Sequence, residues 1–218
     1  MKLALFDLDN TLLAGDSDYA WAQFLIERGI LDRAVYEERN AHYYAHYKAG
    51  TLDIDEYLGF QSAPLVGRSR LELDAWHAEF MQSKVLPMIL PKARALLARH
   101  ADALRIIVTA TNRFITGPIA EELGVAELIA CELEESEHGY TGRGAGVPSF
   151  QEGKIRRLEM WLAERRLELD TFEESWFYSD SLNDLPLLRK VTHPVAVDPD
   201  PTLRDHARRH GWPVISLR

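Results

Sequence analysis

Short apolar runs separated by helical patterns recur along most of the chain. Leu3–Phe6 predicts one buried strand, and Leu104–Val108, which is rich in β-branched residues, predicts a second. Weaker candidate strands lie at 128–131, 176–178, 194–197 and 213–215. Continuous apolar runs that alternate with helices are typical of a parallel sheet covered on both faces. The pattern therefore predicts an α/β fold built on a doubly wound, Rossmann-like parallel sheet.

The helices expected between these strands have clear start and stop signals. Pro91 suits the first position of a helix that ends near His100. Gly124 suits the position just after a helix over 115–123. Two further helices are expected over 152–165 and 201–210. Each of the four helices precedes a candidate strand, which is the rhythm of βαβ units.

Residues 16–86 break this rhythm, because they contain no convincing strand. Their pattern predicts four helices, over 17–28, 32–49, 53–63 and 69–83, and Ser69 with Glu72 has the spacing of a capping box. We expect an all-helical cap domain at 16–86, inserted into a core domain made of 1–15 and 87–218. A smaller insert at 132–151 is expected to form a hairpin or flap.

Composition narrows the class of protein. The 218 residues are 46% hydrophobic and 27% charged, as in an ordinary globular protein. No apolar run approaches the roughly 20 residues of a membrane span, and the first run is too short for a signal peptide. The single Cys131 can form neither an intramolecular disulfide nor a zinc cluster, so a cytoplasmic location is expected. The net charge of −9 disfavours nucleic acid and membranes as partners.

The carboxylates of Asp7 and Asp9 follow the first predicted strand directly. Other Asp-x-Asp pairs occur in the chain, but only this one stands at the carboxyl end of a buried strand, where open α/β sheets bind ligands. Two carboxylates there repel each other, so a cation is expected between them. Mg²⁺ prefers one or two carboxylates, water and phosphate oxygens. The alternative for this pair alone is a solvated turn.

Two more segments carry candidate phosphate ligands. Thr109 and Ala110 end the second predicted strand, where a hydroxyl and free N–H groups can hold a phosphate, although an ordinary helix N-cap is the alternative. Lys154 follows Gly153, but a P-loop is excluded because Pro148 stands where that motif needs glycine. Lys154 alone is also typical of a surface lysine.

Asp180 and Asp184 form a second acidic cluster after the aromatic strand at 176–178. They lie at the strand end and at the start of the next helix. One of them offers a metal ligand, and the other offers a carboxylate that would contact the ligands of the metal and not the metal itself. Taken with the other segments, the chain predicts a nucleophile, a cation, a hydroxyl and a lysine at one edge of the sheet.

The order of these motifs resembles the haloacid dehalogenase (HAD) superfamily of phosphotransferases. Its four motifs are matched in chain order by Asp7, Asp9 and Thr11, then Thr109, then Lys154, then Asp180 and Asp184. A long helical insert after the first motif resembles the C1 cap of the phosphoserine-phosphatase-like subclass IB. Within that subclass, the segments 109–112, 178–181 and 211–214 resemble a bacterial branch that includes assigned histidinol-phosphatases.

The resemblance implies a Mg²⁺-dependent phosphomonoester hydrolase. Asp7 would attack phosphorus and form an aspartyl-phosphate, and Asp9 would protonate the leaving alcohol and then activate water. The metal would bind the Asp7 side chain, the Asp9 backbone carbonyl and the Asp180 side chain. A cap that closes over the site would exclude bulk water.

The remaining motif residues receive supporting roles from the same resemblance. Lys154 would offset the negative charge of Asp7 and of the phosphoryl group. Thr109 and the N–H groups near Ala110 would hold phosphoryl oxygens. Asp184 and Asn183 would orient metal-bound water, Lys154 or the substrate.

Two departures from phosphoserine phosphatases bear on the substrate. Those enzymes carry a glutamate shortly after the first motif that binds the substrate amine, and here Asp16 is the closest acidic residue. Ser179 stands where their fourth motif usually has glycine. Asp16 favours an amino-alcohol phosphate, histidinol phosphate foremost, and its alternative role is to cap a helix.

Several functions remain open at this level. Besides a histidinol-phosphatase, the chain is compatible with a phosphatase for phosphoserine or another amino-alcohol phosphate, with a phosphotransferase, and with a non-catalytic binding protein on this scaffold. The expected partner is a small phosphate ester, and a monomer or homodimer is expected.

Overall fold

A seven-stranded sheet forms the centre of the computed structural model, which describes residues 1–218. The order of strands across the sheet is β4-β3-β2-β1-β5-β6-β7. All neighbours pair in parallel except β3 and β4, which are antiparallel. The strands are β1 (Lys2–Phe6), β2 (Leu104–Asn112), β3 (Glu127–Ser136), β4 (Gly139–Ala145), β5 (Glu174–Ser179), β6 (His193–Val197) and β7 (Val214–Ile215).

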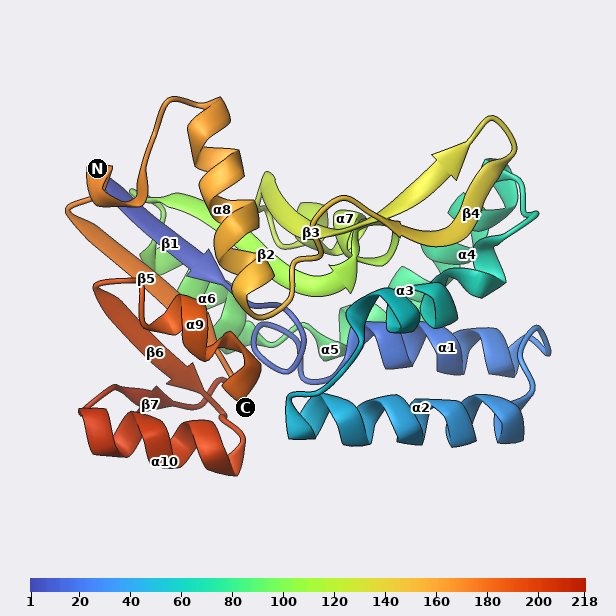
Figure 1. Ribbon diagram of the computed structural model, residues 1–218, viewed down its shortest axis with the longest axis horizontal. Helices are drawn as coiled ribbons and strands as arrows, with labels where there is room; N and C mark the ends of the chain where they lie inside the picture. The colour runs from blue at the N-terminus through green and yellow to red at the C-terminus, as the bar shows by residue number, and fades with distance from the viewer.

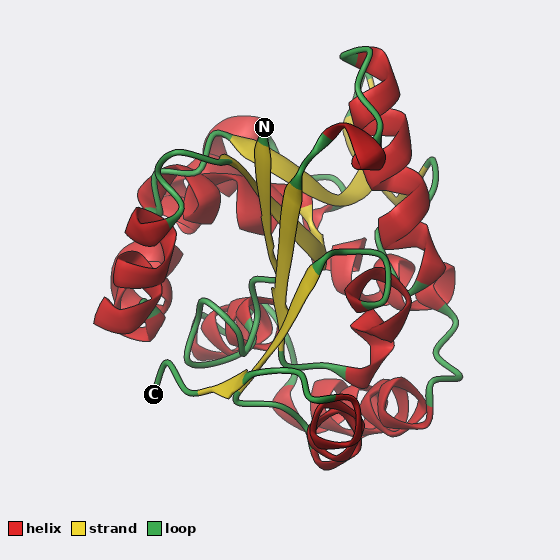
Figure 2. Cartoon of the chain, turned by 90° about the vertical axis from the view of Figure 1, so that its left-hand side faces the viewer, coloured by secondary structure: helices red, strands yellow, loops and turns green.

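Helices cover both faces of this sheet, as the end-on view in Figure 2 shows. The core helices are α6 (Pro91–Arg99), α7 (Arg113–Glu122), α8 (Glu152–Glu164), α9 (Leu185–Leu188) and α10 (Pro201–His210), with short 3₁₀ turns η3 (Leu169–Thr171) and η4 (Leu182–Asp184). Side chains of β1 alternate between the faces. Phe6 joins a hydrophobic cluster with α6 and α7, whereas Leu5 joins a separate cluster with α8, α9 and α10.

The predicted doubly wound α/β sheet is therefore confirmed, with one correction at its edge. The sheet is not wholly parallel, because β3 runs on beyond the core and returns as β4. This hairpin is the flap that the glycines at 139–146 predicted. The sequence pattern marked only the buried start of β3, since the outer half of the hairpin is largely exposed or half-buried.

Four of the helices between β1 and β2 form the helical insert, and Figure 1 shows them grouped at one end of the molecule beside the β3–β4 hairpin. They are α1 (Ser17–Glu27), α2 (Arg33–Ala49), α3 (Ile54–Ser62) and α4 (Arg70–Phe80), followed by the π-helical turn η2 (Met81–Val85) and the short α5 (Leu86–Met88); a 3₁₀ turn, η1 (Ala63–Leu65), follows α3. Ser69 caps α4 as predicted, but Glu72 pairs with Arg68 and does not complete a capping box.

The helical insert rests on the core through aromatic packing. Trp21 of α1 meets Phe114 of α7 edge to face, with ring centroids 5.4 Å apart. Leu13 and Ile89 pair where the chain leaves the core and returns to it. Because the two crossings lie side by side, we propose that the cap comprises residues 16–86, with 1–15 and 87–218 as the core.

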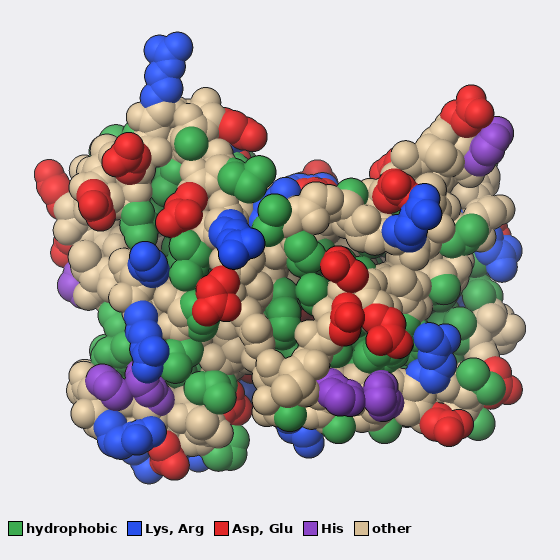
Figure 3. All heavy atoms as spheres, in the orientation of Figure 1, with side chains coloured by type: hydrophobic (Ala, Val, Ile, Leu, Met, Phe, Trp, Pro, Cys, Tyr) green, Lys and Arg blue, Asp and Glu red, His purple; other side chains and the backbone are tan.

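The surface adds two plain facts. None of the helices combines the length and the apolar character that crossing a bilayer requires. On the face drawn in Figure 3, Lys and Arg side chains are scattered among acidic ones and form no broad basic field.

Candidate active site

Asp7 lies at the carboxyl end of β1, the central strand of the sheet. Its backbone N–H donates to the carbonyl of Tyr178 at 2.9 Å, which extends the β1–β5 pairing by one residue. Asp7 as a whole residue is only 7% exposed. Burial, partly offset by the charge of Lys154, raises the pKa of Asp7 to about 7. The Asp7 carboxylate is therefore almost fully shielded from water, at the edge where open α/β sheets bind ligands.

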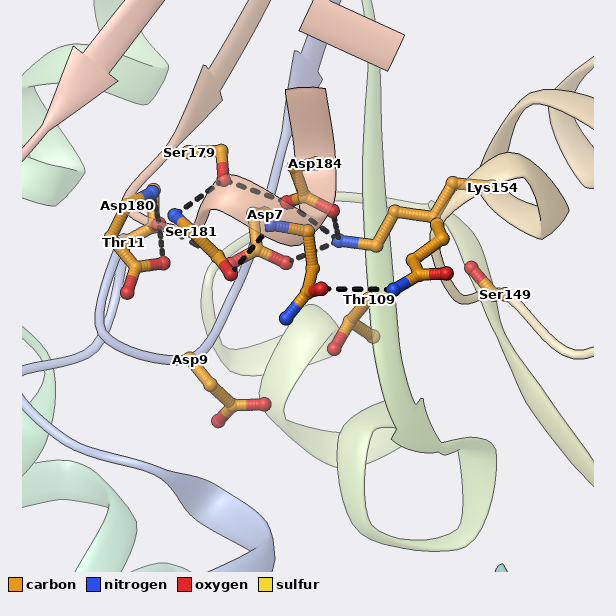
Figure 4. Close-up of polar contacts among 12 residues, drawn as sticks. Asp7, Asp9, Thr11, Thr109, Ser149, Lys154, Ser179, Asp180, Ser181 and Asp184 are labelled. Atoms are coloured by element: carbon orange, nitrogen blue, oxygen red, sulfur yellow. Dashed lines mark hydrogen bonds and ion pairs between the residues drawn. The ribbon is translucent and has the colours of Figure 1, made fainter. Parts of the chain in front are cut away.

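Lys154, in the first turn of α8, links Asp7 to Asp184. Its Nζ lies 2.8 Å from Asp7 Oδ1 and 2.7 Å from Asp184 Oδ1, and it is 2% exposed. Burial alone would lower the pKa of Lys154, but the charges of Asp184 and Asp7 outweigh it and raise the pKa. Ser179 Oγ donates to Asp184 at 2.7 Å, a bond that a glycine at this position could not make. The lysine is thus fixed and charged beside the Asp7 carboxylate (Figure 4).

Thr11 connects the first motif to the fourth. Its hydroxyl is within donating distance of Asp7 Oδ2, at 3.3 Å, and of Asp180 Oδ1, at 3.1 Å. The same oxygen accepts from the backbone N–H of Asp180 at 3.1 Å. Burial, then the charges of Asp7 and Asp184, raise the pKa of Asp180 well above its usual range. No lysine or arginine compensates Asp180, so this carboxylate suits a metal cation.

Asp9 stands apart from the Asp7–Lys154–Asp184 group, as Figure 4 shows. Its two carboxylate oxygens accept from the backbone N–H of Ser17 at 2.7 Å and from the hydroxyl of Thr111 at 2.8 Å. Burial and the charge of Asp16 raise the pKa of Asp9 to about 6, against these hydrogen bonds. A carboxyl group that titrates near neutrality can both give and take a proton in the same cycle.

Thr109 and Ala110 lie in an irregular stretch of β2. The β2–β3 register pairs Val108 with Ile129 but Asn112 with Cys131, so two extra residues of β2 are accommodated between them. Thr109 Oγ1 accepts from the Thr111 N–H at 3.2 Å and donates to no protein acceptor. The hydroxyl hydrogen is free for a ligand, as a phosphate-binding residue requires.

The side chain of Asn183 forms hydrogen bonds with Tyr47 and Gln151 and none with the carboxylates of the site. Its Nδ2 donates to the Tyr47 carbonyl at 3.1 Å, and its Oδ1 accepts from Gln151 at 3.0 Å. The Tyr47 hydroxyl shares a hydrogen bond with Ser181 at 2.8 Å. These contacts tie the end of cap helix α2 to the loop after β5. Asn183 thus contacts the cap in this arrangement.

Asp16 takes the capping role that was its alternative. It is exposed, and its side chain accepts from the Tyr19 N–H at 2.9 Å at the start of α1. Its neighbour Asp18 is instead buried beneath the cap and carries an oxygen that accepts no hydrogen bond.

The sequence analysis did not assign roles to Thr111, Ser179 or Asp18. Thr111 had a signal, because residues 109 and 111 are two apart and share one face of a strand. Ser179 was noted only as a departure from the fourth motif. Asp18 had no signal, since its burial depends on how α1 packs beneath α3.

Comparison with known proteins places this geometry in a family. The model of the haloacid dehalogenase-like hydrolases matches residues 4–189. The chain is 46% identical to a histidinol-phosphatase of Neisseria meningitidis serogroup C (strain 8013), across 100% of this chain and 99% of that protein.

Two solved structures extend the comparison. A crystal structure of a protein of unknown function from Bordetella pertussis Tohama I is 46% identical, with a TM-score of 0.93 over 100% of this chain and 99% of that one. A phosphoserine phosphatase solved as a phospho-aspartyl intermediate analogue is 17% identical, with a TM-score of 0.69 over 100% of this chain and 93% of that one. The latter shows the same fold.

The resemblance inferred from the motifs is confirmed, and so is the predicted enzyme class, a phosphatase. Asp7, Lys154, Asp180 and Asp184 all lie within the matched residues 4–189. The chain belongs to the haloacid dehalogenase-like hydrolase family.

Proposed function

We propose that this enzyme hydrolyses histidinol phosphate through an aspartyl-phosphate formed on Asp7, with Mg²⁺ as its cofactor. One observation carries the proposal. The Asp7 carboxylate is held by Lys154 at 2.8 Å, and Asp9, two residues on, is held separately by Thr111 at 2.8 Å. A nucleophile and a proton carrier with separate supports are what a two-step phosphoryl transfer needs.

The steps follow from these two side chains. An oxygen of Asp7 attacks phosphorus while the protonated Asp9 gives its proton to the leaving ester oxygen, so the alcohol departs neutral. Asp9, now ionised, takes a proton from water, which attacks the phosphorus of the aspartyl-phosphate and releases inorganic phosphate. The Ser17 N–H and the Thr111 hydroxyl hold Asp9 in place for both transfers.

The donor set at the sheet edge fits Mg²⁺. The carboxylates of Asp7 and Asp180 converge on Thr11, and the backbone carbonyl of Asp9 accepts no hydrogen bond from the protein. No three His, Cys, Asp or Glu side chains converge as a metal cluster, so phosphate and water oxygens would complete the set. When bound, the metal supplies positive charge to the phosphoryl oxygens and lowers the repulsion between carboxylates.

Lys154, Thr109 and Ala110 complete the phosphate site in this proposal. Lys154 stabilises the charge that develops on phosphoryl oxygens near Asp7. Thr109 donates its free hydroxyl hydrogen, and the irregular stretch of β2 offers N–H groups at Ala110. Asp184 holds Lys154, and Asn183 holds the end of the cap, which excludes water around the intermediate.

Two findings support histidinol phosphate over other esters. The first is the 46% identity, over essentially full length, to a histidinol-phosphatase. The second is the excess of carboxylates near Asp9, which suits a substrate that carries a cationic group beside its phosphate ester. Phosphoserine, which adds a carboxylate of its own, is less well matched to these acidic groups.

Release of inorganic phosphate from histidinol phosphate tests the proposal, with Asp7→Asn as the inactive control. We expect activity with Mg²⁺, none with EDTA, and slower hydrolysis of phosphoserine. Acid quenching with ³²P-labelled substrate should trap label on the wild-type protein only. Label that moves to an added alcohol would indicate a phosphotransferase. No phosphate release from any ester would leave a binding protein and refute the proposal.

A further inference from the structure

Asp18, in the first turn of α1, is a buried carboxylate with one unpartnered oxygen and no cation beside it. It is 3% exposed, its Oδ1 accepts no hydrogen bond, and it takes part in no ion pair. The hydroxyl of the preceding Ser17 is also buried and unpartnered. A buried polar group without a partner costs about 1–3 kcal/mol, and a charge costs more. Packing therefore does not explain this carboxylate, which the proposed catalytic steps also leave unused.

The groups that face Asp18 offer it no cation. The carboxylates of Asp16, at the N-cap of α1, and of Asp9, in the loop after β1, face Asp18. From α3, the hydroxyl of Tyr57 faces it. Tyr36 of α2 lies close enough for Asp18 to raise the pKa of its hydroxyl, after the effect of burial. Oxygen atoms on all of these elements thus face the position. The Gln61 amide, which donates to the Tyr57 hydroxyl at 2.6 Å, is neutral, so no positive charge is supplied to Asp18.

This position adjoins the point where the leaving group must lie. The Ser17 N–H donates to Asp9 Oδ1 at 2.7 Å, so residue 18 follows directly on a residue in contact with the proton donor. The ester oxygen has to approach Asp9 to receive its proton. The carbon atoms next to that oxygen therefore come to lie near Asp18.

We propose that Asp18 binds the ammonium group of a β-amino-alcohol phosphate, with the hydroxyls of Tyr57 and Ser17 as further acceptors. The inference rests on the proposed phosphatase function and names the residue that recognises the amine of its substrate. In such a substrate the ammonium stands on the second carbon from the ester oxygen, within reach of a side chain beside Asp9. Asp16, which is exposed and caps α1, does not have this role.

Matched pairs of substrates test the assignment. One pair is histidinol phosphate and 3-(imidazol-4-yl)propyl phosphate, which lacks only the amine; the other is O-phosphoethanolamine and ethyl phosphate. Asp18→Asn should raise KM for each aminated member about 10- to 100-fold, as expected for one charged hydrogen bond, and leave kcat and the KM of the other member within about twofold. Asp32→Asn removes an equal charge from the exposed cap of α2 and should change neither KM.

Each other outcome has one meaning. Equal effects of Asp18→Asn on both members of a pair would overturn the assignment, and a selective loss in Asp16→Asn alone would give the amine to Asp16. Asp18→Asn should fold, because it removes an uncompensated charge. If it does not, Tyr57→Phe should still show a smaller selective rise in KM, and an equal rise for both members would overturn the assignment. A wild-type protein that cleaves no phosphate ester would refute the proposed function itself.

Discussion

Replacing Lys154 with methionine should separate the structural role of this residue from its chemical role. The side chain is 3% exposed and is the only cation in contact with Asp7 and Asp184. Methionine keeps most of the volume but leaves two buried carboxylates uncompensated. Removing one partner of a buried ion pair costs about 3–5 kcal/mol. For a domain of this size that corresponds to a fall in Tm of about 6–20 °C.

The loss should depend on pH in a defined direction. Without the lysine, the folded-state pKa of Asp7 rises further above its value of about 7, so the variant loses stability relative to wild type as pH rises above about 7. The deficit relative to wild type should therefore grow from neutral towards alkaline pH. It should shrink as pH falls below about 7, because Asp7 is then protonated in both folded proteins.

Urea unfolding followed by tryptophan fluorescence, without Mg²⁺, measures this loss. Lys2→Met is the matched control, because Lys2 pairs with Asp102 at the surface, where water screens the pair, so its loss should barely change stability. Lys154→Met combined with Asp184→Asn should recover part of the stability while kcat stays about 10²- to 10³-fold low. A loss below about 1 kcal/mol at pH 9, or one that does not vary with pH, would refute the reasoning.

Three further predictions address the reaction. Asp7→Asn should lower kcat at least ~10³-fold with an unchanged circular dichroism spectrum, because the covalent route cannot start. Asp180→Asn should raise the Mg²⁺ concentration needed for half-maximal activity. Asp9→Asn should slow turnover but leave that Mg²⁺ concentration almost unchanged. Identical metal titrations of the two variants would contradict these assignments. The Thr111 hydroxyl donates a hydrogen bond to Asp9 that lowers the pKa of Asp9, which is about 6 with this bond in place. Thr111→Val removes the bond and should raise that pKa. The descending limb of kcat/KM against pH should therefore move to higher pH, and an unshifted limb would exclude Thr111 as a positioning residue.

Much of the core was predictable from periodicity alone. The alternation of Leu3, Ala4, Leu5 and Phe6 between two hydrophobic clusters is a local property of a strand buried on both faces. Helix ends followed from local chemistry as well, as Pro91 at the start of α6 illustrates. The antiparallel pairing of β4 with β3 was harder to predict from the sequence, because it depends on where the hairpin contacts the cap.

The site was predictable where side chains follow strand ends and less so where packing decides. Asp7, Asp180 and Thr109 come directly after or within strand termini, so topology alone brings them to one edge. The engagement of Asn183 with Tyr47 depends on how the cap rests on the core, which no local pattern encodes. Asp18 was missed for the same reason: its neighbours Asp9 and Tyr57 come from separate elements.

The balance of charge in this site connects its stability to its function. Six carboxylates, those of Asp7, Asp9, Asp16, Asp18, Asp180 and Asp184, face one another across the core and the cap, and the only lysine or arginine that pairs with any of them is Lys154. Such an arrangement opposes folding, and the hydrophobic cluster that joins Trp21 and Phe80 of the insert to Phe6 of the sheet offsets it. A phosphate group alone would add to the repulsion. Under the proposed function, the site therefore favours ligands that bring cations with them, a metal at the Asp7–Asp180 end and the ammonium group that we propose for the Asp18 end.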